Sequence, residues 1–83
     1  MYPNPFNSSL KIVLNLENPD NQKVDIIFTD MLGRVIEQAN SIVPGGMYEF
    51  EWKPKSKLSN GIYFCHLRVN NRIVGTEKVI YCE

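Results

Sequence analysis

Between Tyr48 and Trp52, aromatic and acidic residues alternate strictly, as the sequence YEFEW shows. Successive side chains of a β-strand point to opposite faces, so this order predicts a strand with one apolar face and one charged face. The same period of two residues recurs along the chain in short runs, whereas apolar residues at helical spacing are almost absent. The pattern therefore predicts an all-β fold.

Turn-forming residues divide the chain into runs of strand length. Gly33 is expected at positive φ in a tight turn, and Asn70-Asn71 suits the two-residue turn of a hairpin. The runs predict about seven short strands, or six if the third is irregular, in a small antiparallel β-sandwich of immunoglobulin-like or fibronectin-like type. The strands that we predict are Leu10 to Leu16, Lys23 to Thr29, Arg34 to about Ala39, Tyr48 to Trp52, Ile62 to Val69 and Arg72 to Tyr81.

The size and charge of the chain exclude several classes of function. Its 83 residues allow one domain with a small core and leave little room for a catalytic cleft. Nine Lys and Arg balance nine Asp and Glu, which argues against a nucleic-acid partner or a polybasic membrane anchor. No apolar run approaches the roughly 20 residues of a transmembrane helix. We expect residues 1–83 to form a single domain that is not an enzyme and needs no cofactor.

The chain opens with a proline-rich stretch, and residues 1–8 are expected to form an extended segment ahead of the first strand. The stretch has neither the charged nor the apolar region of a signal peptide. Either the chain is cytoplasmic or it is a fragment whose targeting signal lies upstream, and the proline-rich start immediately before the first strand favours the fragment.

Cys65 and Cys82 are predicted to be free thiols. If Val69 faces Arg72 across the hairpin, Cys65 lies opposite Thr76, and Cys82 is about 20 Å further along that strand. A disulfide requires Cα atoms within about 7 Å. Cys65 is expected to be a small core residue.

No set of residues predicts a metal site or a catalytic centre. His66 is the only histidine, and it points to the opposite face of its strand from Cys65. Asp20, Asp25 and Asp30 fall on a turn, a strand and another turn, unlike the compact loop of a calcium site. Asp25 is expected to point outward to solvent.

The aromatic stripe from Tyr48 to Trp52 has two interpretations. It is the best source of core for a small sandwich. Alternatively, Tyr48 and Trp52 form a flat platform on which a sugar stacks. In that case the chain is an immunoglobulin-like accessory module that binds carbohydrate.

Four stretches of the chain keep an order and spacing that resemble the C-terminal sorting domain of type IX secretion substrates from Bacteroidetes. They are YPNPFN at residues 2–7, FTDMLGRVI at 28–36, LSNGIYF at 58–64 and TEKVI at 76–80. The resemblance covers nearly the whole chain.

The resemblance implies a non-enzymatic β-sandwich at the C-terminus of an exported cargo protein. In that family the outer-membrane translocon recognises the domain and a sortase-like peptidase removes it in many members, so the resemblance implies that the cargo reaches the cell surface or the medium. The family pattern falls on Pro3, Asn4, Pro5, Asp30, Gly33, Arg34, Gly61, Tyr63 and Lys78.

Structural roles suit several of these positions. Asp30, Gly33 and Arg34 are expected to shape a turn, and Gly61 to permit a close approach before Tyr63 enters the core. We expect recognition to use the terminal hairpin, whose outer edge strand offers backbone groups to a partner. Dimerisation through an edge strand is a further alternative, as is a structural spacer domain within a secreted enzyme.

Overall fold

Six strands make up the fold in the computed structural model, which describes residues 6–17, 20–55 and 57–82. The described residues contain no helix, and therefore none that could cross a bilayer. The strands are β1 (Leu10–Leu16), β2 (Gln22–Thr29), β3 (Val35–Val43), β4 (Gly46–Trp52), β5 (Gly61–Val69) and β6 (Arg72–Tyr81).

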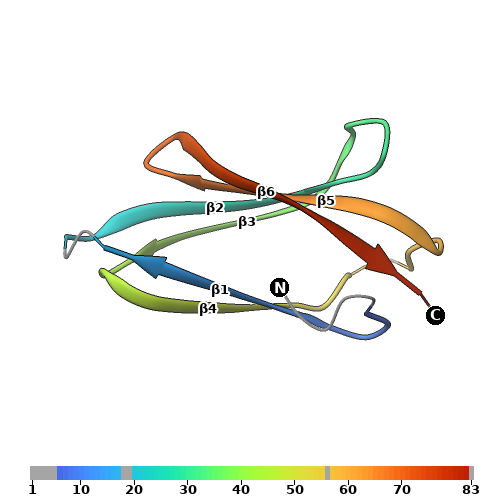
Figure 1. Ribbon diagram of the computed structural model, residues 1–83, viewed down its shortest axis with the longest axis horizontal. Coiled ribbons are helices and arrows are strands. Elements are labelled where there is room, and N and C mark those ends of the chain that lie inside the picture. Colours follow the sequence, from blue (N-terminus) through green and yellow to red (C-terminus); the bar gives the residue numbers. More distant parts are fainter. Residues whose placement is uncertain (1–5, 18–19, 56, 83) are drawn as a thin grey trace.

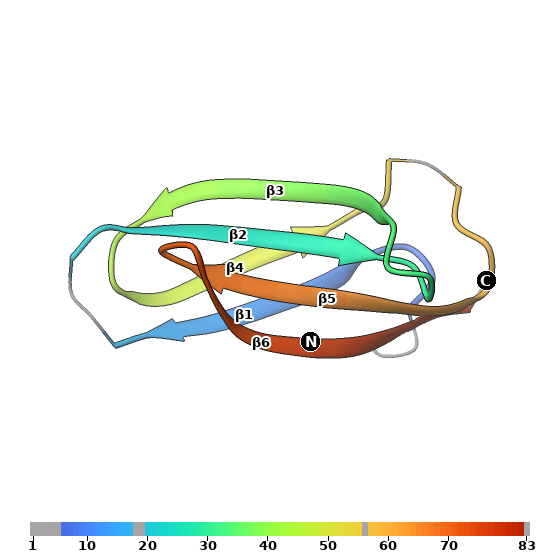
Figure 2. The same cartoon turned by 90° about the horizontal axis from the view of Figure 1, so that it is seen from above.

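The strands form two antiparallel sheets that face each other as a sandwich. One sheet is the pair β1–β4, and the other has the order β3–β2–β5–β6. Figure 1 shows the pair β1–β4 lying beneath the larger sheet, and Figure 2 shows β3 and β6 along its two margins. The prediction of an all-β antiparallel sandwich is confirmed, with six strands where about seven were expected.

The third strand is longer than predicted and continues past Ala39 to Val43. The polar residues Asn40 and Ser41 resemble the start of a loop in the sequence. In the structure they pair with Asp25 and Val24 of β2, so the ladder continues through them. Pairing with a neighbouring strand has overridden the local composition.

Apolar residues of both sheets meet in one core. Val24, Ile26 and Phe28 of β2 are buried in this core together with Leu10 and Ile12 of β1. Trp52 from β4 stacks on Phe28 with ring centroids 3.7 Å apart. The buried apolar residues come from all six strands and from Phe6.

Phe6 ties the beginning of the described chain to its end. Its N–H donates to Ile80 O at 2.9 Å, and its carbonyl accepts from the Cys82 N–H at 2.9 Å, which makes a short parallel bridge beside Tyr81. The Phe6 ring is buried against Trp52 and Tyr81, with centroids 5.5 and 5.3 Å away. Phe6 is thus part of the core.

The β5–β6 hairpin turns at Asn70 and Asn71, which have φ of 51° and 68° as the two-residue turn requires. Val69 faces Arg72 as predicted, but Val74 is an extra residue that forms a β-bulge. Cys65 therefore lies opposite Glu77, and the predicted pairing with Thr76 is wrong by one residue.

Both cysteines are free thiols, as predicted. Cys65 is buried in the core, whereas Cys82 is exposed. Burial disfavours the thiolate and raises the pKa of Cys65 to about 12. Cys65 therefore behaves as an inert core residue.

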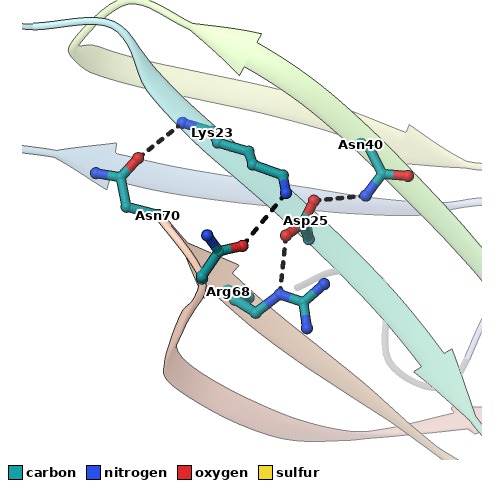
Figure 3. Close-up of polar contacts among 6 residues, drawn as sticks. Lys23, Asp25, Asn40, Arg68 and Asn70 are labelled. Carbon is teal, nitrogen blue, oxygen red and sulfur yellow. Dashed lines mark hydrogen bonds and ion pairs between the residues drawn. The ribbon is translucent and has the colours of Figure 1, made fainter.

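The prediction that Asp25 points to solvent is wrong, because its side chain is fully buried. It lies on the outer face of the larger sheet, where Asn40 of β3 and Arg68 of β5 flank it and donate to its two carboxylate oxygens, Arg68 Nε at 2.8 Å (Figure 3). The hydrogen bond from Asn40 and then that from Arg68 lower the pKa of Asp25. Each oxygen of the buried Asp25 carboxylate thus accepts a hydrogen bond.

Candidate recognition site

Five of the family-pattern residues come together at one end of the sandwich. The turn between β2 and β3 holds Asp30, Gly33 and Arg34. Strand β5 begins at Gly61, and Tyr63 is its third residue. The antiparallel register joins these segments, because Thr29 pairs with Phe64. Gly61 also pairs with Tyr81, so the end of β6 lies here too (Figure 2). We call residues 30–36, 58–63 and 80–82 the motif end.

Asp30 organises the β2–β3 turn. Its Oδ1 accepts from the N–H groups of Leu32 at 2.9 Å and Arg34 at 3.0 Å. Its Oδ2 accepts from Arg34 Nε at 2.7 Å. The backbone closes the turn through Asp30 N to Arg34 O, and Gly33 supplies the positive φ of 84° that was predicted. The turn is therefore held in one conformation.

The same contacts favour the charged form of the Asp30 carboxyl. The Arg34 N–H bond, followed by the Arg34 side chain and the Leu32 N–H, lowers the pKa of Asp30. The carboxylate stays ionised at neutral pH and keeps its three donors. The pairing uses Nε of Arg34, and the side chain of this arginine is 75% exposed.

Large apolar side chains are exposed on this rigid turn. Met31 is 67% exposed and Leu32 is 80% exposed, and Val35 and Ile36 follow at the start of β3. Turn tips ordinarily carry Gly, Asn, Asp, Ser or Pro. A cluster of apolar side chains beside an exposed arginine is typical of a surface that binds another protein.

A groove of about 490 Å³ adjoins the turn. Tyr63 lies in it, and the Tyr63 hydroxyl donates to Ser59 O at 2.7 Å, which fixes the loop ahead of β5. Residues that line the groove include Asp30, Arg34, Ile36, Trp52, Leu58 and Tyr63. The groove thus joins the β2–β3 turn to the loop before β5.

Gly61 has a different role from the one expected. A Cβ atom on Gly61 would meet nothing within 4 Å, so no neighbouring chain approaches it closely. Its φ of 152° is instead a conformation that favours glycine. The residue sets the direction in which the chain enters β5.

The other pattern positions lie elsewhere. Lys78 is exposed on β6 opposite Phe64 and does not line the groove. Pro3, Asn4 and Pro5 lie outside the described residues. The structure thus groups five of the nine residues that the resemblance singled out.

The aromatic stripe belongs to the core. Trp52 is 1% exposed and its ring stacks on Phe28. Tyr48 is half-buried, and its hydroxyl donates to Ser41 Oγ of the facing sheet at 3.3 Å. A sugar-stacking platform needs an exposed ring face, which Trp52 lacks.

His66 lies between two threonines on the outer face of the larger sheet. Its Nε2 is 3.0 Å from Thr29 Oγ1 and its Nδ1 is 3.1 Å from Thr76 Oγ1. Among the residues that the structure describes, no three His, Cys, Asp or Glu side chains are grouped as ligands for a metal ion. Both ring nitrogens of His66 are thus within hydrogen-bond distance of threonine hydroxyls, which is typical of a histidine with a structural role.

Sequence reasoning missed two features of this end. One is the exposure of Met31 and Leu32, for which two large apolar residues inside a predicted turn were the available signal. The other is the bridge from Phe6 to Tyr81, which joins residues at opposite ends of the chain and left no local pattern.

Comparison with known protein families identifies the family of the chain. The family described as secretion system C-terminal sorting domain matches residues 1–82. No curated protein and no solved structure matched the chain. The match covers nearly the whole chain, so the chain belongs to the family of C-terminal sorting domains of type IX secretion.

Proposed function

We propose that this domain directs a preceding cargo protein through the outer-membrane type IX translocon to the cell surface or the medium. Membership of the sorting-domain family supports the role of a sorting signal, and that role is not catalytic. The observation that carries the finer proposal is the gathering of five pattern residues at the motif end. We propose that the translocon contacts this end.

The domain is recognised in its folded form. Asp30 and Tyr63 make their hydrogen bonds within the chain, in the β2–β3 turn and the loop before β5. Gly33 supplies the positive φ of the turn. Met31, Leu32 and Arg34 are left to face a partner. A rigid turn that presents them loses little conformational freedom on binding.

The edge of β6 is a smaller target than the sequence suggested. Phe6 already makes the edge hydrogen bonds at Ile80 O and Cys82 N. A partner strand would have to displace Phe6, whose ring is packed against Trp52 and Tyr81. The side chains of the motif end require no such displacement, which favours them as the contact surface.

A secretion assay in a Bacteroidetes host tests the proposal. A periplasm-directed fluorescent reporter carries residues 2–83 at its C-terminus, in strains with and without the type IX translocon. We expect reporter at the surface or in the medium only in the intact strain. Reporter trapped in the periplasm of both strains, from a fusion that is folded and intact, would contradict the proposal.

A further inference from the structure

We propose that the domain forms a homodimer in which β3 pairs antiparallel with β3 of a second copy. β3 is one of the two margins of the larger sheet, so one side of its backbone has no partner strand among the described residues (Figure 2). The occupant of such an edge is an extended strand, because its N–H and C=O groups alternate along the chain.

The two margins of the sheet differ in how they are protected. β6 carries the bulge at Val74 and the charged side chains of Arg72, Glu77 and Lys78, and Phe6 occupies its end. Bulges and lysines are common devices against edge pairing. β3 has its irregularity at its first residues, next to Thr29, and pairs regularly from Glu37 to Val43. It contains one charged residue and neither lysine nor proline.

The sequence of β3 is complementary to itself. It reads VIEQANSIV, and its centre is Ala39. Antiparallel pairing about Ala39 sets Ile36 against Ile42 of the second copy and Gln38 against Asn40. It also sets Val35 against Val43 and Glu37 against Ser41, so every apolar residue meets an apolar one and no like charges meet.

Neighbouring registers lose this match. A continuous sheet must keep the core side chains of both copies on one face, so the register can change only in steps that preserve the alternation. The next register in one direction sets Ile36 against Asn40. The next in the other direction sets Ile42 against Gln38. The pairing about Ala39 is therefore favoured over both.

The exposed residues of β3 fit this pairing. Ile36 is 38% exposed and Ile42 is 68% exposed, so each has apolar surface to bury against the other copy. The side chain of Asn40 is held by Asp25 and that of Glu37 accepts from the Lys55 N–H. Glu37 pairs with the inward-pointing Phe28 across the ladder, so the loop at Lys55 contacts the inner face of β3.

The dimer is expected to be weak. A single pair of strands buries less than the roughly 1,200 Å² at which stable interfaces begin. We therefore expect a monomer–dimer equilibrium with Kd on the order of 10–100 µM. Sedimentation velocity over that concentration range measures it directly, as a mass that rises toward twice the 9.6 kDa of one chain.

Charge substitutions at the facing isoleucines test the register. In the variant Ile36→Lys/Ile42→Lys, lysine meets lysine, and we expect Kd to rise at least about tenfold. In the variant Ile36→Glu/Ile42→Lys, opposite charges meet, and we expect the dimer to return. Ile73→Lys, at a comparably exposed position on β6, is the matched control and should leave Kd unchanged.

A crosslink provides a second measurement that does not depend on surface charge. Ala39 lies on the twofold axis, where facing Cα atoms of an antiparallel pair are about 4.5–5.5 Å apart. Ala39→Cys in a Cys82→Ser background should therefore form a disulfide-linked dimer under mild oxidation. A chain that stays monomeric throughout the concentration range would overturn the proposal. So would a dimer that responds equally to both charge variants.

Discussion

The two ends of the sandwich use similar turn chemistry to present very different surfaces. At the motif end, the Asp30 carboxylate accepts backbone N–H groups and locks the β2–β3 turn. At the other end, Asn70 Oδ1 accepts from Lys23 N at 3.0 Å and locks the β5–β6 turn (Figure 3). The first turn displays Met31 and Leu32, whereas the second displays asparagines. Rigidity is common to both ends, and the exposed apolar surface is the difference.

The two ends also differ in what stabilises them. Aromatic rings of Phe6, Trp52 and Tyr81 pack together beneath the motif end. On the other half of the larger sheet, the buried Asp25 is held by Arg68 and Asn40. Substitutions can disrupt the aromatic cluster and the Asp25 network separately. The effects on stability and on secretion can therefore be compared at each end.

The largest effect is expected from Trp52→Ala. This change removes a buried ring that stacks on Phe28, and it should lower the free energy of unfolding by about 3–5 kcal/mol. That is a large share of the total for a small domain. Urea denaturation measures it, with Trp52→Phe as the milder control. An unfolding midpoint equal to that of the wild type would show that the ring is not part of the core.

Arg68→Ala should have the next largest effect. It leaves the buried Asp25 carboxylate without its guanidinium partner, and we expect a loss of about 2 kcal/mol. Arg72→Ala, an exposed change on the same hairpin, should cost less than about 0.5 kcal/mol. Thermal unfolding measures both losses of stability. Equal losses in the two variants would mean that the buried Arg68–Asp25 pair contributes no more than an exposed arginine.

Acid should weaken the same network. The pKa of Asp25 is lowered in the folded chain, chiefly by the hydrogen bond from Asn40. Its contribution to stability is therefore present above the unfolded pKa of about 3.9 and is lost as pH falls through the lower folded value. Unfolding midpoints from pH 7 to pH 2 should fall less steeply for Asp25→Asn than for the wild type. Parallel curves would contradict the assignment.

Asp30→Ala should separate stability from secretion. It releases the β2–β3 turn without touching the core, so we expect a small fall in Tm and a fall in reporter secretion of roughly tenfold. The matched change at the other end is Asn70→Ala, which releases the lock on Lys23 and should leave secretion unchanged. Equal secretion of the two variants would remove the distinction between the ends.

Most of the fold could be predicted from short-range patterns. Alternation located the strands, and the glycine and asparagine turns were predicted because positive φ favours those residues. The bulge at Val74 was missed because the turn fixes only the first pairs of the hairpin. Gly75, inside the strand, was the one local sign of an irregularity.

Two features that local patterns did not reveal depend on residues far apart in sequence. The buried Asp25 accepts hydrogen bonds from Asn40 and Arg68, which are 15 and 43 residues away. The alternation of residues in its own strand predicts only that Asp25 points away from the core. The resemblance located the motif residues, but their meeting at one end follows from the pairing of β2 with β5 and β5 with β6.

The most direct test compares two pairs of exposed apolar residues in the secretion assay. One reporter carries Met31→Ser/Leu32→Ser at the motif end, and the other carries Ile73→Ser/Val74→Ser on β6, where the side chains are also more than half exposed. Both domains should unfold at the wild-type temperature. We predict that the first reporter stays in the periplasm and the second is secreted. Normal secretion of the first would contradict recognition through the motif end.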